Sequence, residues 1–388
     1  MNEQEILKII SGGECSKVQF KERLPHIDNL AHEIIAFSNS QGGLIIFGIN
    51  DKTGKINGLS FGEIREINQQ LVNAASQKIY PPVYLTTETI HVDNEALVVA
   101  RIEEGTGKPY KDASGIIYTK NGSDKRKITS NNELARLLGS GGFLSADEMS
   151  VLGSSIEDID LDQFNSFLLK KYKKTLDDLN VKMEKILENL GLSRDGVLTL
   201  TGLLLFSKKR HKFRPQFSIQ CVSVDGSVIG NKYTDNEGVF EGTLEEIFQR
   251  TMDFIGRNMK KIPESNGFNS LSKWEIPYEV FEELIVNALV HRDYFVSSTI
   301  KVFVFSDRIE IVSPGRLPNS LTIENVKNGV SIARNPILLS AVQFVLPYKG
   351  LGTGILRAYS LYPEIFMENR VEENQFKIIM KRRAGESR

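Results

Sequence analysis

The chain has 388 residues, of which 40% are hydrophobic and 25% charged, values typical of a globular protein with two or three domains. Its 48 Lys and Arg residues balance 49 Asp and Glu residues, so net charge gives no indication of nucleic-acid binding. Two cysteines, the lack of a hydrophobic signal core and the lack of an apolar run of membrane-spanning length predict a cytoplasmic protein and argue against secretion and membrane insertion.

The first 138 residues are expected to form one domain of helices and strands. The residue pattern predicts a helix over 32–37, a buried strand over 44–47 and a helix over 132–138. The run Gly-Ser-Gly-Gly at 139–142 is the clearest linker in the chain. We therefore place the first domain boundary after residue 138.

Residues 139–270 are expected to form this linker and a middle segment of helices and strands. Charged helices are predicted within 160–190, and an amphipathic helix over 241–259. A buried helix over 198–206 and a strand over 217–224 flank a basic loop at 207–214. The second domain boundary is placed between residues 270 and 271.

The third predicted domain, 271–388, carries polar residues at helical spacing. Glu283, Asn287 and His291 are four residues apart, so a helix places them on one face opposite an apolar face. A carboxylate can orient or deprotonate a water molecule, and an amide oxygen can hold a hard cation such as Mg²⁺. The alternative is an ordinary solvated helix face.

Two glycine turns follow this helix. Strands predicted over 300–305 and 308–312 form a hairpin that ends in Ser313-Pro314-Gly315. Further on, Gly350-Leu351-Gly352-Thr353-Gly354 precedes an apolar run that predicts another helix. Such a loop can surround phosphate with backbone N–H groups, although a flexible turn has the same composition.

Helix, hairpin and glycine loop in this order resemble the GHKL nucleotide-binding fold shared by type II topoisomerases, histidine kinases and MutL-like repair proteins. The resemblance implies ATP and Mg²⁺ as ligands, with Glu283 as a water-activating base and Asn287 as the metal ligand. Where that family has an Asp that receives the adenine amino group, this chain has Ser313, so we expect ATP binding with at most slow hydrolysis. The implied cofactor-binding residues are Asn287, His291, Ser313, Gly315, Gly350, Gly352, Thr353 and Gly354.

The N-terminal motifs are similar to those of the Schlafen AlbA-type domain. They are Gly12-Gly13-Glu14, Val18-Gln19-Phe20-Lys21-Glu22, Ser38-Asn39-Ser40-Gln41-Gly42-Gly43 and Gly48-Ile49-Asn50-Asp51. With His-Arg-Asp-Tyr at 291–294 and Arg-Asn-Pro at 334–336, the whole chain resembles bacterial Schlafen AlbA-type (divergent AAA-4) transcriptional regulators. The expected fold class is therefore α/β (α+β): an AlbA-type domain, a helical middle segment and a divergent GHKL-like α/β sandwich.

The resemblance also bears on nuclease activity. In Schlafen relatives that cut RNA, two Glu residues five apart and a later Asp bind metal, whereas this chain has Glu14 and Gln19, with Asn50 or Asp51 at the third position. Losing a carboxylate weakens metal binding and water activation. We therefore favour a nucleic-acid-binding domain, and a metal-dependent ribonuclease using Glu14, Glu22 and Asp51 is the alternative. A scaffold without either activity is a third possibility.

Local basic clusters provide candidate phosphate contacts despite the balanced net charge. Tyr118, beside one cluster, could stack on a base or pack against lysine stems. Our overall hypothesis is a homodimer in which Mg-ATP switches the binding of nucleic acid, with DNA favoured over RNA. The candidate nucleic-acid-binding residues are Lys17, Lys21, Lys120, Lys125, Arg126 and Lys127.

Overall fold

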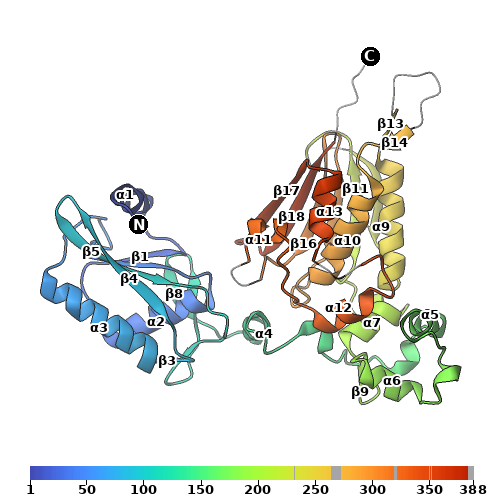
Figure 1. Ribbon diagram of the computed structural model, residues 1–388, viewed down its shortest axis with the longest axis horizontal. Helices are drawn as coiled ribbons and strands as arrows, with labels where there is room; N and C mark the ends of the chain where they lie inside the picture. The colour runs from blue at the N-terminus through green and yellow to red at the C-terminus, as the bar shows by residue number, and fades with distance from the viewer. Residues whose placement is uncertain (231, 264–271, 319–320, 349, 351, 383–388) are drawn as a thin grey trace. The chain divides into compact units, whose positions relative to one another are not determined.

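The structure is a computed structural model that describes residues 1–230, 232–263, 272–318, 321–348, 350 and 352–382, apart from the side chains of Asn132 and Pro263. The chain forms two compact units that divide between Leu144 and Ser145 (Figure 1). The boundary expected after residue 138 falls within a helix, Asn131–Ser140, and the boundary expected between 270 and 271 lies outside the described residues. Both stay predictions.

The first unit alternates helices and strands at its start and then continues with a run of strands before its last helix. Its elements are α1 (Glu3–Gly12), β1 (Val18–Lys21), α2 (Ile27–Asn39), β2 (Gly43–Phe47), α3 (Phe61–Gln77), β3 (Ile79–Tyr80), β4 (Leu85–Val92), β5 (Glu95–Ile102), β6 (Lys111–Asp112), β7 (Tyr118–Asn121), β8 (Asp124–Lys127) and α4 (Asn131–Ser140).

A four-stranded sheet in the order β1-β2-β5-β4 is the centre of this unit. Strand β1 is parallel to β2, and β5 is antiparallel to both β2 and β4. Leu44 and Ile46 of β2 belong to the core that includes Ile6 of α1, whereas Ile45 and Phe47 belong to the core formed with α2 and α3. Because both faces are covered, the strand is apolar throughout, and the strand predicted over 44–47 is confirmed.

The second unit is larger and begins with a group of helices. Its elements are η1 (Ala146–Glu148), η2 (Ile156–Asp158), α5 (Leu161–Tyr172), η3 (Asp177–Leu179), α6 (Met183–Asn189), β9 (Ser193–Arg194), β10 (Val197–Leu198), α7 (Leu200–Phe206), α8 (Arg210–Phe213), β11 (Ile219–Val224), β12 (Tyr233–Val239), α9 (Leu244–Asn258), β13 (Lys261–Pro263), β14 (Ser272–Trp274), α10 (Tyr278–His291), β15 (Ile300–Val304), β16 (Arg308–Pro314), α11 (Ile323–Lys327), α12 (Pro336–Val342), α13 (Gly354–Leu361), β17 (Ile365–Arg370) and β18 (Gln375–Lys381).

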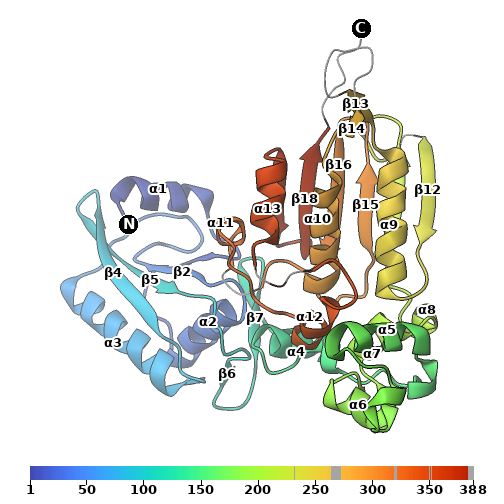
Figure 2. The same ribbon diagram turned by 45° about the vertical axis from the view of Figure 1, so that its right-hand side comes forward.

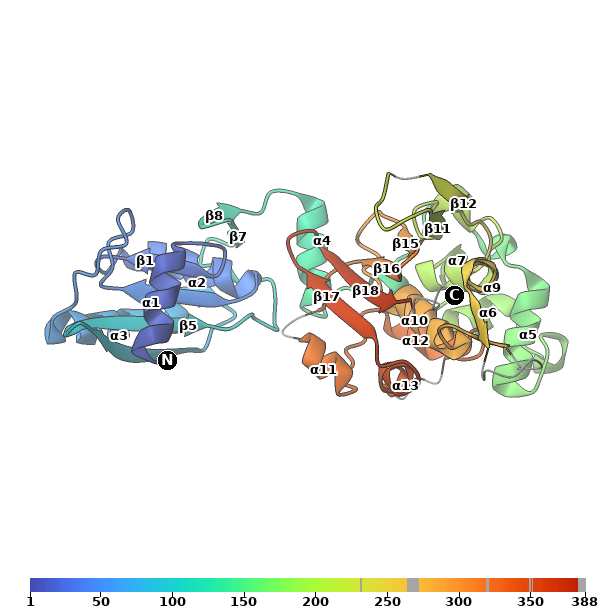
Figure 3. The same cartoon turned by 90° about the horizontal axis from the view of Figure 1, so that it is seen from above.

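A six-stranded mixed sheet in the order β12-β11-β15-β16-β18-β17 carries this unit. Helices α9, α10 and α13 run along one of its faces, as Figures 1 and 2 show, and α10 packs between the other two. Seen from above, α10 and α13 lie on the same side of β16 and β18 (Figure 3). The mixed α/β fold expected from the sequence is confirmed, and the hairpin predicted over 300–312 is the antiparallel pair β15 and β16.

The segment expected as a separate middle part contributes directly to this layered unit. Strands β11 and β12 belong to the six-stranded sheet, and β11 pairs in parallel with β15. Phe164 of α5 and Leu203 of α7 belong to the same hydrophobic core as Leu284 of α10. The described residues between 145 and 263 therefore belong to the same compact unit as the C-terminal candidate residues.

The basic run after α7 has a structural role. The Arg210 side chain is fully buried and donates hydrogen bonds to four backbone oxygens, including those of Phe217 at 2.6 Å and Gly242 at 2.8 Å. Burial lowers the Arg210 pKa to about 10, so the group remains charged at neutral pH. Lys208 and Lys209 pair with Asp160 and Asp158.

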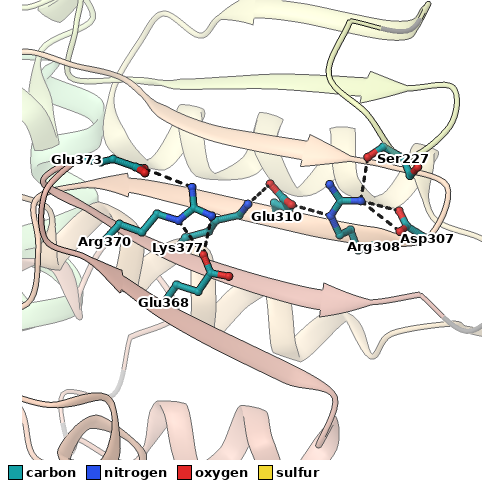
Figure 4. A network of polar contacts seen from close by, with 8 residues as sticks. All are labelled: Ser227, Asp307, Arg308, Glu310, Glu368, Arg370, Glu373 and Lys377. Carbon is teal, nitrogen blue, oxygen red and sulfur yellow. Dashed lines mark hydrogen bonds and ion pairs between the residues drawn. The ribbon is translucent and has the colours of Figure 1, made fainter. Parts of the chain in front are cut away.

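The sheet face opposite the helices carries paired charges (Figure 4). Glu310 of β16 accepts from Arg308 at 2.6 Å and pairs with Lys377 of β18 at 2.7 Å. On β17, Arg370 pairs with Glu368 at 2.7 Å. Because alternate residues of a strand point to opposite faces, the neighbours Ile309 and Ile311 lie in the core.

Candidate functional site

A cavity in the second unit lies between α10, the end of β16 with the segment that follows it, the glycine loop and α13. The candidate residues that line it are Glu283, Asn287, His291, Ser313, Gly315, Gly350, Gly352, Thr353 and Gly354. They come from one helix, one strand end and one loop. The structure therefore brings all nine candidate residues of the C-terminal region to one cavity.

Glu283 lies on the cavity wall with both carboxylate oxygens engaged. Oε1 accepts a hydrogen bond from Asn287 Nδ2 at 2.9 Å, and Oε2 pairs with Arg357 Nη2 at 2.6 Å. The Glu283 side chain is 6% exposed and that of Arg357 is 40% exposed. Since the Asn287 amide nitrogen is turned toward Glu283, its oxygen is the atom left for a ligand.

The glycine loop takes a shape that side chains would oppose. Gly350 and Gly352 both have φ +68°, a region that favours glycine. A Cβ on Gly352 would lie 2.9 Å from the backbone oxygen of Gly329, and a Cβ on Gly354 would lie 1.5 Å from Glu283 Oε1. Thr353 is the N-cap of α13, although its side chain makes no capping hydrogen bond. Leu351, also part of the predicted loop, lies outside the described residues.

The Ser-Pro-Gly turn joins the end of β16 to the end of α10. The backbone N–H of Asp293 donates a hydrogen bond to the backbone oxygen of Pro314 at 2.9 Å, and the Ser313 hydroxyl donates to the Ala288 carbonyl at 3.4 Å. Gly315 has φ +100°, and a Cβ there would lie 2.4 Å from Asp293 Cβ. A glycine is therefore required at this position, and the turn holds Ser313 at the cavity wall.

His291, at the end of α10, is half-buried beside Arg334. Burial lowers the His291 pKa to about 4, and the positive charge of Arg334 lowers it further in the same direction. The imidazole is therefore neutral at pH 7. A neutral imidazole can donate to or accept from a ligand without adding charge to the cavity.

A His291→Gln variant is expected to lose less stability than wild type when the pH falls from 7 to 4. The unfolded imidazole titrates near 6.5 and the folded one near 4, so the unfolded state binds more protons between these values. The stabilising contribution is complete above pH 6.5 and is lost as the pH falls through 4. Urea denaturation should show a difference between the two pH profiles of roughly 3 kcal/mol. Identical profiles would contradict this assignment.

The N-terminal basic residues fall into two groups. Lys17 and Lys127 are exposed, and Lys21 is half-buried at the end of β1. Lys125, in contrast, pairs with the buried Glu33 at 2.7 Å, and Arg126 pairs with Glu133 of α4. In the first group the ammonium can reach a phosphate directly, whereas in the second a phosphate would have to replace a carboxylate.

Lys120 is the candidate whose placement differs most from expectation. Its side chain is 2% exposed, and its ammonium donates to Gln19 Oε1 at 2.9 Å and lies 3.6 Å from Glu33 Oε2. Burial lowers the Lys120 pKa, and the negative charge of Glu33 opposes this effect. Strands β7 and β8 pack on α2, which encloses the amine, so Lys120 supports the hairpin and does not face a polymer here.

Tyr118, which we considered as a base-stacking residue, is also buried. Its ring stacks on His32 of α2 with centroids 4.3 Å apart. Asn39 at the end of α2 donates to the backbone oxygens of Tyr118 at 2.9 Å and Tyr110 at 2.8 Å. These contacts fix β7 to the helix, and the Tyr118 ring packs inside the protein on His32, a partner that neither of the two roles we considered had named.

The N-terminal carboxylates of Glu14 and Glu22 have different hydrogen-bond partners. Glu14 accepts from Gln19 Nε2 at 2.6 Å, whereas Glu22 accepts from Asn50 at 2.7 Å and from Asn57 at 2.9 Å. Asp51 is exposed. Among the described residues, no group of three or more His, Cys, Asp or Glu side chains is placed to hold a metal ion. The ribonuclease alternative therefore gains no support from this geometry.

Comparisons with known protein families match two separate segments. Residues 14–129 match the family described as "Schlafen, AlbA_2", and residues 297–380 match the family described as "Putative ATP-dependent DNA helicase recG C-terminal". The chain thus combines a Schlafen AlbA_2 region with a recG C-terminal-type region. Both resemblances recognised in the sequence are confirmed.

Among solved structures, the chain is similar to the DIP2311 protein of Corynebacterium diphtheriae, with 20% identity, coverage of 98% of this chain and 80% of that chain, and a TM-score of 0.49. It is also similar to the N-terminal domain of a RecG-related protein from Nitrosomonas europaea, with 17% identity, coverage of 34% and 96%, and a TM-score of 0.26. The comparison with curated proteins found no match. In the part of the chain that the structure describes, no helix has both the length and the apolar character needed to span a membrane.

The recG C-terminal-type region covers only part of the cavity. Its match begins at residue 297, so Ser313, Gly315 and the glycine loop lie inside it, whereas Glu283, Asn287 and His291 of α10 precede it. The three α10 residues are therefore outside the family match, and it is the folded structure that brings them to the cavity.

Two motif residues outside the lining of this cavity, Arg292 and Asn335, close the end of α10. The buried Asn335 donates from Nδ2 to the backbone oxygens of Val290 at 2.9 Å and Arg292 at 3.0 Å, which satisfies carbonyls left open where the helix ends. The Arg292 guanidinium is buried over the rings of Phe217 and Tyr294, at 5.0 and 4.9 Å. These residues hold the helix end that presents His291.

Sequence reasoning missed five polar residues among the described lining of the cavity. They are Arg316, Ser331, Arg334, Tyr348 and Arg357. Arg357 follows Gly354 by three residues, and this helical spacing could have placed it near the glycine loop. Arg334 was noted as part of a motif without a role at the site. Its guanidinium donates to the backbone oxygens of Arg316 at 2.8 Å and His291 at 3.4 Å.

Proposed function

We propose that the chain is an ATP-binding, nucleic-acid-binding regulatory protein, in which Mg-ATP in the second unit switches the binding properties of the first. One observation carries the proposal: candidate residues from α10, the end of β16 and the glycine loop meet at one cavity. The matches to the recG C-terminal family and the Schlafen AlbA_2 family support the two halves separately.

The charge of the cavity suits a polyanion. Arg316, Arg334 and Arg357 line it, and Glu283 is the one carboxylate among the described lining residues. Glu283 is already paired with Arg357, and His291 is neutral at pH 7 because its pKa is about 4. The wall therefore has a net positive charge, which favours phosphate groups.

The residues also fit Mg²⁺, provided that a nucleotide accompanies it. Mg²⁺ usually takes one or two protein oxygens, and phosphate oxygens and water complete its octahedron. Asn287 would hold it through the amide oxygen, and the hydrogen bond from its amide nitrogen to Glu283 fixes that orientation. Bound Mg²⁺ would neutralise phosphate charge. With one oxygen ligand from the protein, metal binding without nucleotide is not expected.

The base of the nucleotide would contact the apolar part of the wall. Ile311, Phe376 and Ile378 line this part together with Ser313. While the Ser313 hydroxyl donates to Ala288, its lone pairs can accept one hydrogen bond from an amino group. A neutral acceptor binds less strongly than a carboxylate, so we expect the phosphates to contribute most of the affinity.

The geometry supports binding more strongly than hydrolysis. A general base needs a carboxylate oxygen that is available to water. Both oxygens of Glu283 are engaged, one by Asn287 and one by Arg357. We therefore propose slow turnover at most, and a closed form of the Gly350–Gly354 loop that depends on bound nucleotide.

For the first unit we propose nucleic-acid contacts from the basic residues that reach solvent. Lys17 and Lys127 are exposed, and Arg126 and Lys125 could exchange their carboxylate partners for phosphates. We propose DNA, in preference to RNA, as the nucleic acid that is bound, and a homodimer as the assembly. Such contacts would be screened by salt, because phosphate binding releases counterions.

Gly352→Ala tests whether the cavity is the ATP site. Its Cβ would press on the Gly329 carbonyl at 2.9 Å, so the loop must shift. Gly238→Ala is a matched control, because Gly238 has φ +63° and open space around it. Binding of labelled ATP with Mg²⁺ should weaken about tenfold or more in Gly352→Ala and stay near wild type in Gly238→Ala. A wild-type chain without ATP binding would refute the proposal, and equal binding by both variants would remove this cavity from it.

A further inference from the structure

The ion pair between Glu283 and Arg357 links α10 to α13 at the cavity wall. Its oxygen–nitrogen distance is 2.6 Å, and both residues line the cavity. The two ends of the pair are unequal, because the carboxylate is 6% exposed and the guanidinium side chain is 40% exposed. The Glu283 end is therefore fixed in place, whereas the Arg357 end borders open space.

Besides its pairing with Arg357, the Glu283 carboxylate is held by two further contacts. Asn287 donates to Oε1 at 2.9 Å, and the same oxygen lies so close to Gly354 that a Cβ there would overlap it at 1.5 Å. A carboxylate with this little room cannot follow its partner. If the pair separates, the arginine must move.

Arg357 can make that movement without breaking α13. It lies in the first turn of the helix, where its backbone N–H donates to Thr353 at 2.9 Å, and only its long side chain needs to rotate. The guanidinium is a planar donor that can form two parallel hydrogen bonds with a phosphate, just as it can with a carboxylate. A terminal phosphate near Gly354 would compete with Glu283 for it.

We propose that Arg357 senses the terminal phosphate of a nucleoside triphosphate and that Glu283 latches it when that phosphate is absent. This inference rests on the proposed function. Arg357 exchanges its partner Glu283 for the third phosphate, which a diphosphate lacks. The exchange frees one oxygen of Glu283 at the same moment, so recognition of the triphosphate and exposure of the carboxylate are one event.

The test measures the affinities for ATP and ADP, both with Mg²⁺, by titration calorimetry of the full chain. Arg357→Ala should lower the preference for ATP over ADP toward one, because ATP affinity falls more than ADP affinity. Glu283→Gln removes the competing charge, so ATP should bind about tenfold more tightly, the equivalent of one charge-assisted hydrogen bond, while ADP affinity should rise less. In the double variant this gain should vanish, because the two effects act through one contact.

Arg257→Ala is a matched control. Arg257 is also a helical arginine in an ion pair, and its side chain is 42% exposed, but it lies outside this cavity. Its loss should leave the ATP-to-ADP preference at the wild-type value. If wild type binds neither nucleotide, both the proposed function and the latch fail. If wild type binds ATP and Arg357→Ala keeps the same preference, or if Glu283→Gln binds ATP no more tightly, only the latch is refuted.

Discussion

Asn287→Ala is expected to make nucleotide binding independent of Mg²⁺. The Asn287 amide oxygen is the side-chain ligand that the cavity offers to the cation, and alanine removes it together with the hydrogen bond to Glu283. In wild type, Mg²⁺ should raise ATP affinity at least about tenfold, equivalent to about 1.4 kcal/mol. In the variant, ATP affinity in Mg²⁺ should fall to the value measured in EDTA, as filter binding or calorimetry can show.

Two further variants sharpen this test. Asn73→Ala removes an amide from a helix of the first unit, where Gln69 donates to Asn73 over the same four-residue spacing at 3.2 Å, and it should leave Mg²⁺ dependence intact. Asn287→Asp keeps a coordinating oxygen and should retain the Mg²⁺ effect. Equal Mg²⁺ dependence in wild type and Asn287→Ala would refute the proposal that Asn287 is the Mg²⁺ ligand.

Arg210→Met is expected to produce the largest loss of stability. Arg210 is fully buried, and its guanidinium donates to the carbonyls of Arg214 and Phe217, which precede β11, and of Phe240 and Gly242, which follow β12, at one end of this antiparallel pair. Methionine fills similar volume but leaves these oxygens without their buried donor. The free energy of unfolding should fall by about 3–5 kcal/mol, and the unfolding midpoint by roughly 10 °C.

The neighbouring lysines provide the control for Arg210. Lys208 and Lys209 belong to the same basic run, but their side chains are 62% and 63% exposed and pair with Asp160 and Asp158. Substitution of either by methionine should change stability by no more than about 1 kcal/mol, as for other surface ion pairs. Thermal unfolding followed by circular dichroism measures all three variants. If Arg210→Met loses no more stability than Lys209→Met, the structural role proposed for the Arg210 hydrogen bonds is wrong.

The cavity residues of α10 could be predicted because a helix has a fixed period. Glu283, Asn287 and His291 recur every four residues among apolar neighbours, so any helix there places them on one face. Gly315 and Gly352 were recognisable for a related reason, since their positive φ angles require glycine and such residues mark turns. Local geometry was enough in each case.

Basic residues were harder to interpret, because charge alone does not reveal exposure. Lys120 and Arg210 both lie in basic runs that read as surface, yet one is enclosed by Glu33 and Gln19 and the other by backbone carbonyls. The partners of Lys120 and two of those of Arg210 are distant in sequence, and a run of basic residues contains no information about which member turns inward. The parallel pairing of β11 with β15 is also a contact between distant segments, and it joins residues on the two sides of the boundary predicted between 270 and 271. A pattern of neighbouring residues could not predict this pairing.

Residue periodicity and glycine placement, which depend on neighbours within a few positions, already specified the helix face, the hairpin and the two glycine turns of this chain. Only the folded chain decides that Arg357 reaches Glu283, that Asn335 closes α10 and that Lys120 lies inside. The physical reason is the range of the interactions: backbone geometry acts between near neighbours, whereas ion pairs and burial depend on which distant segments pack together.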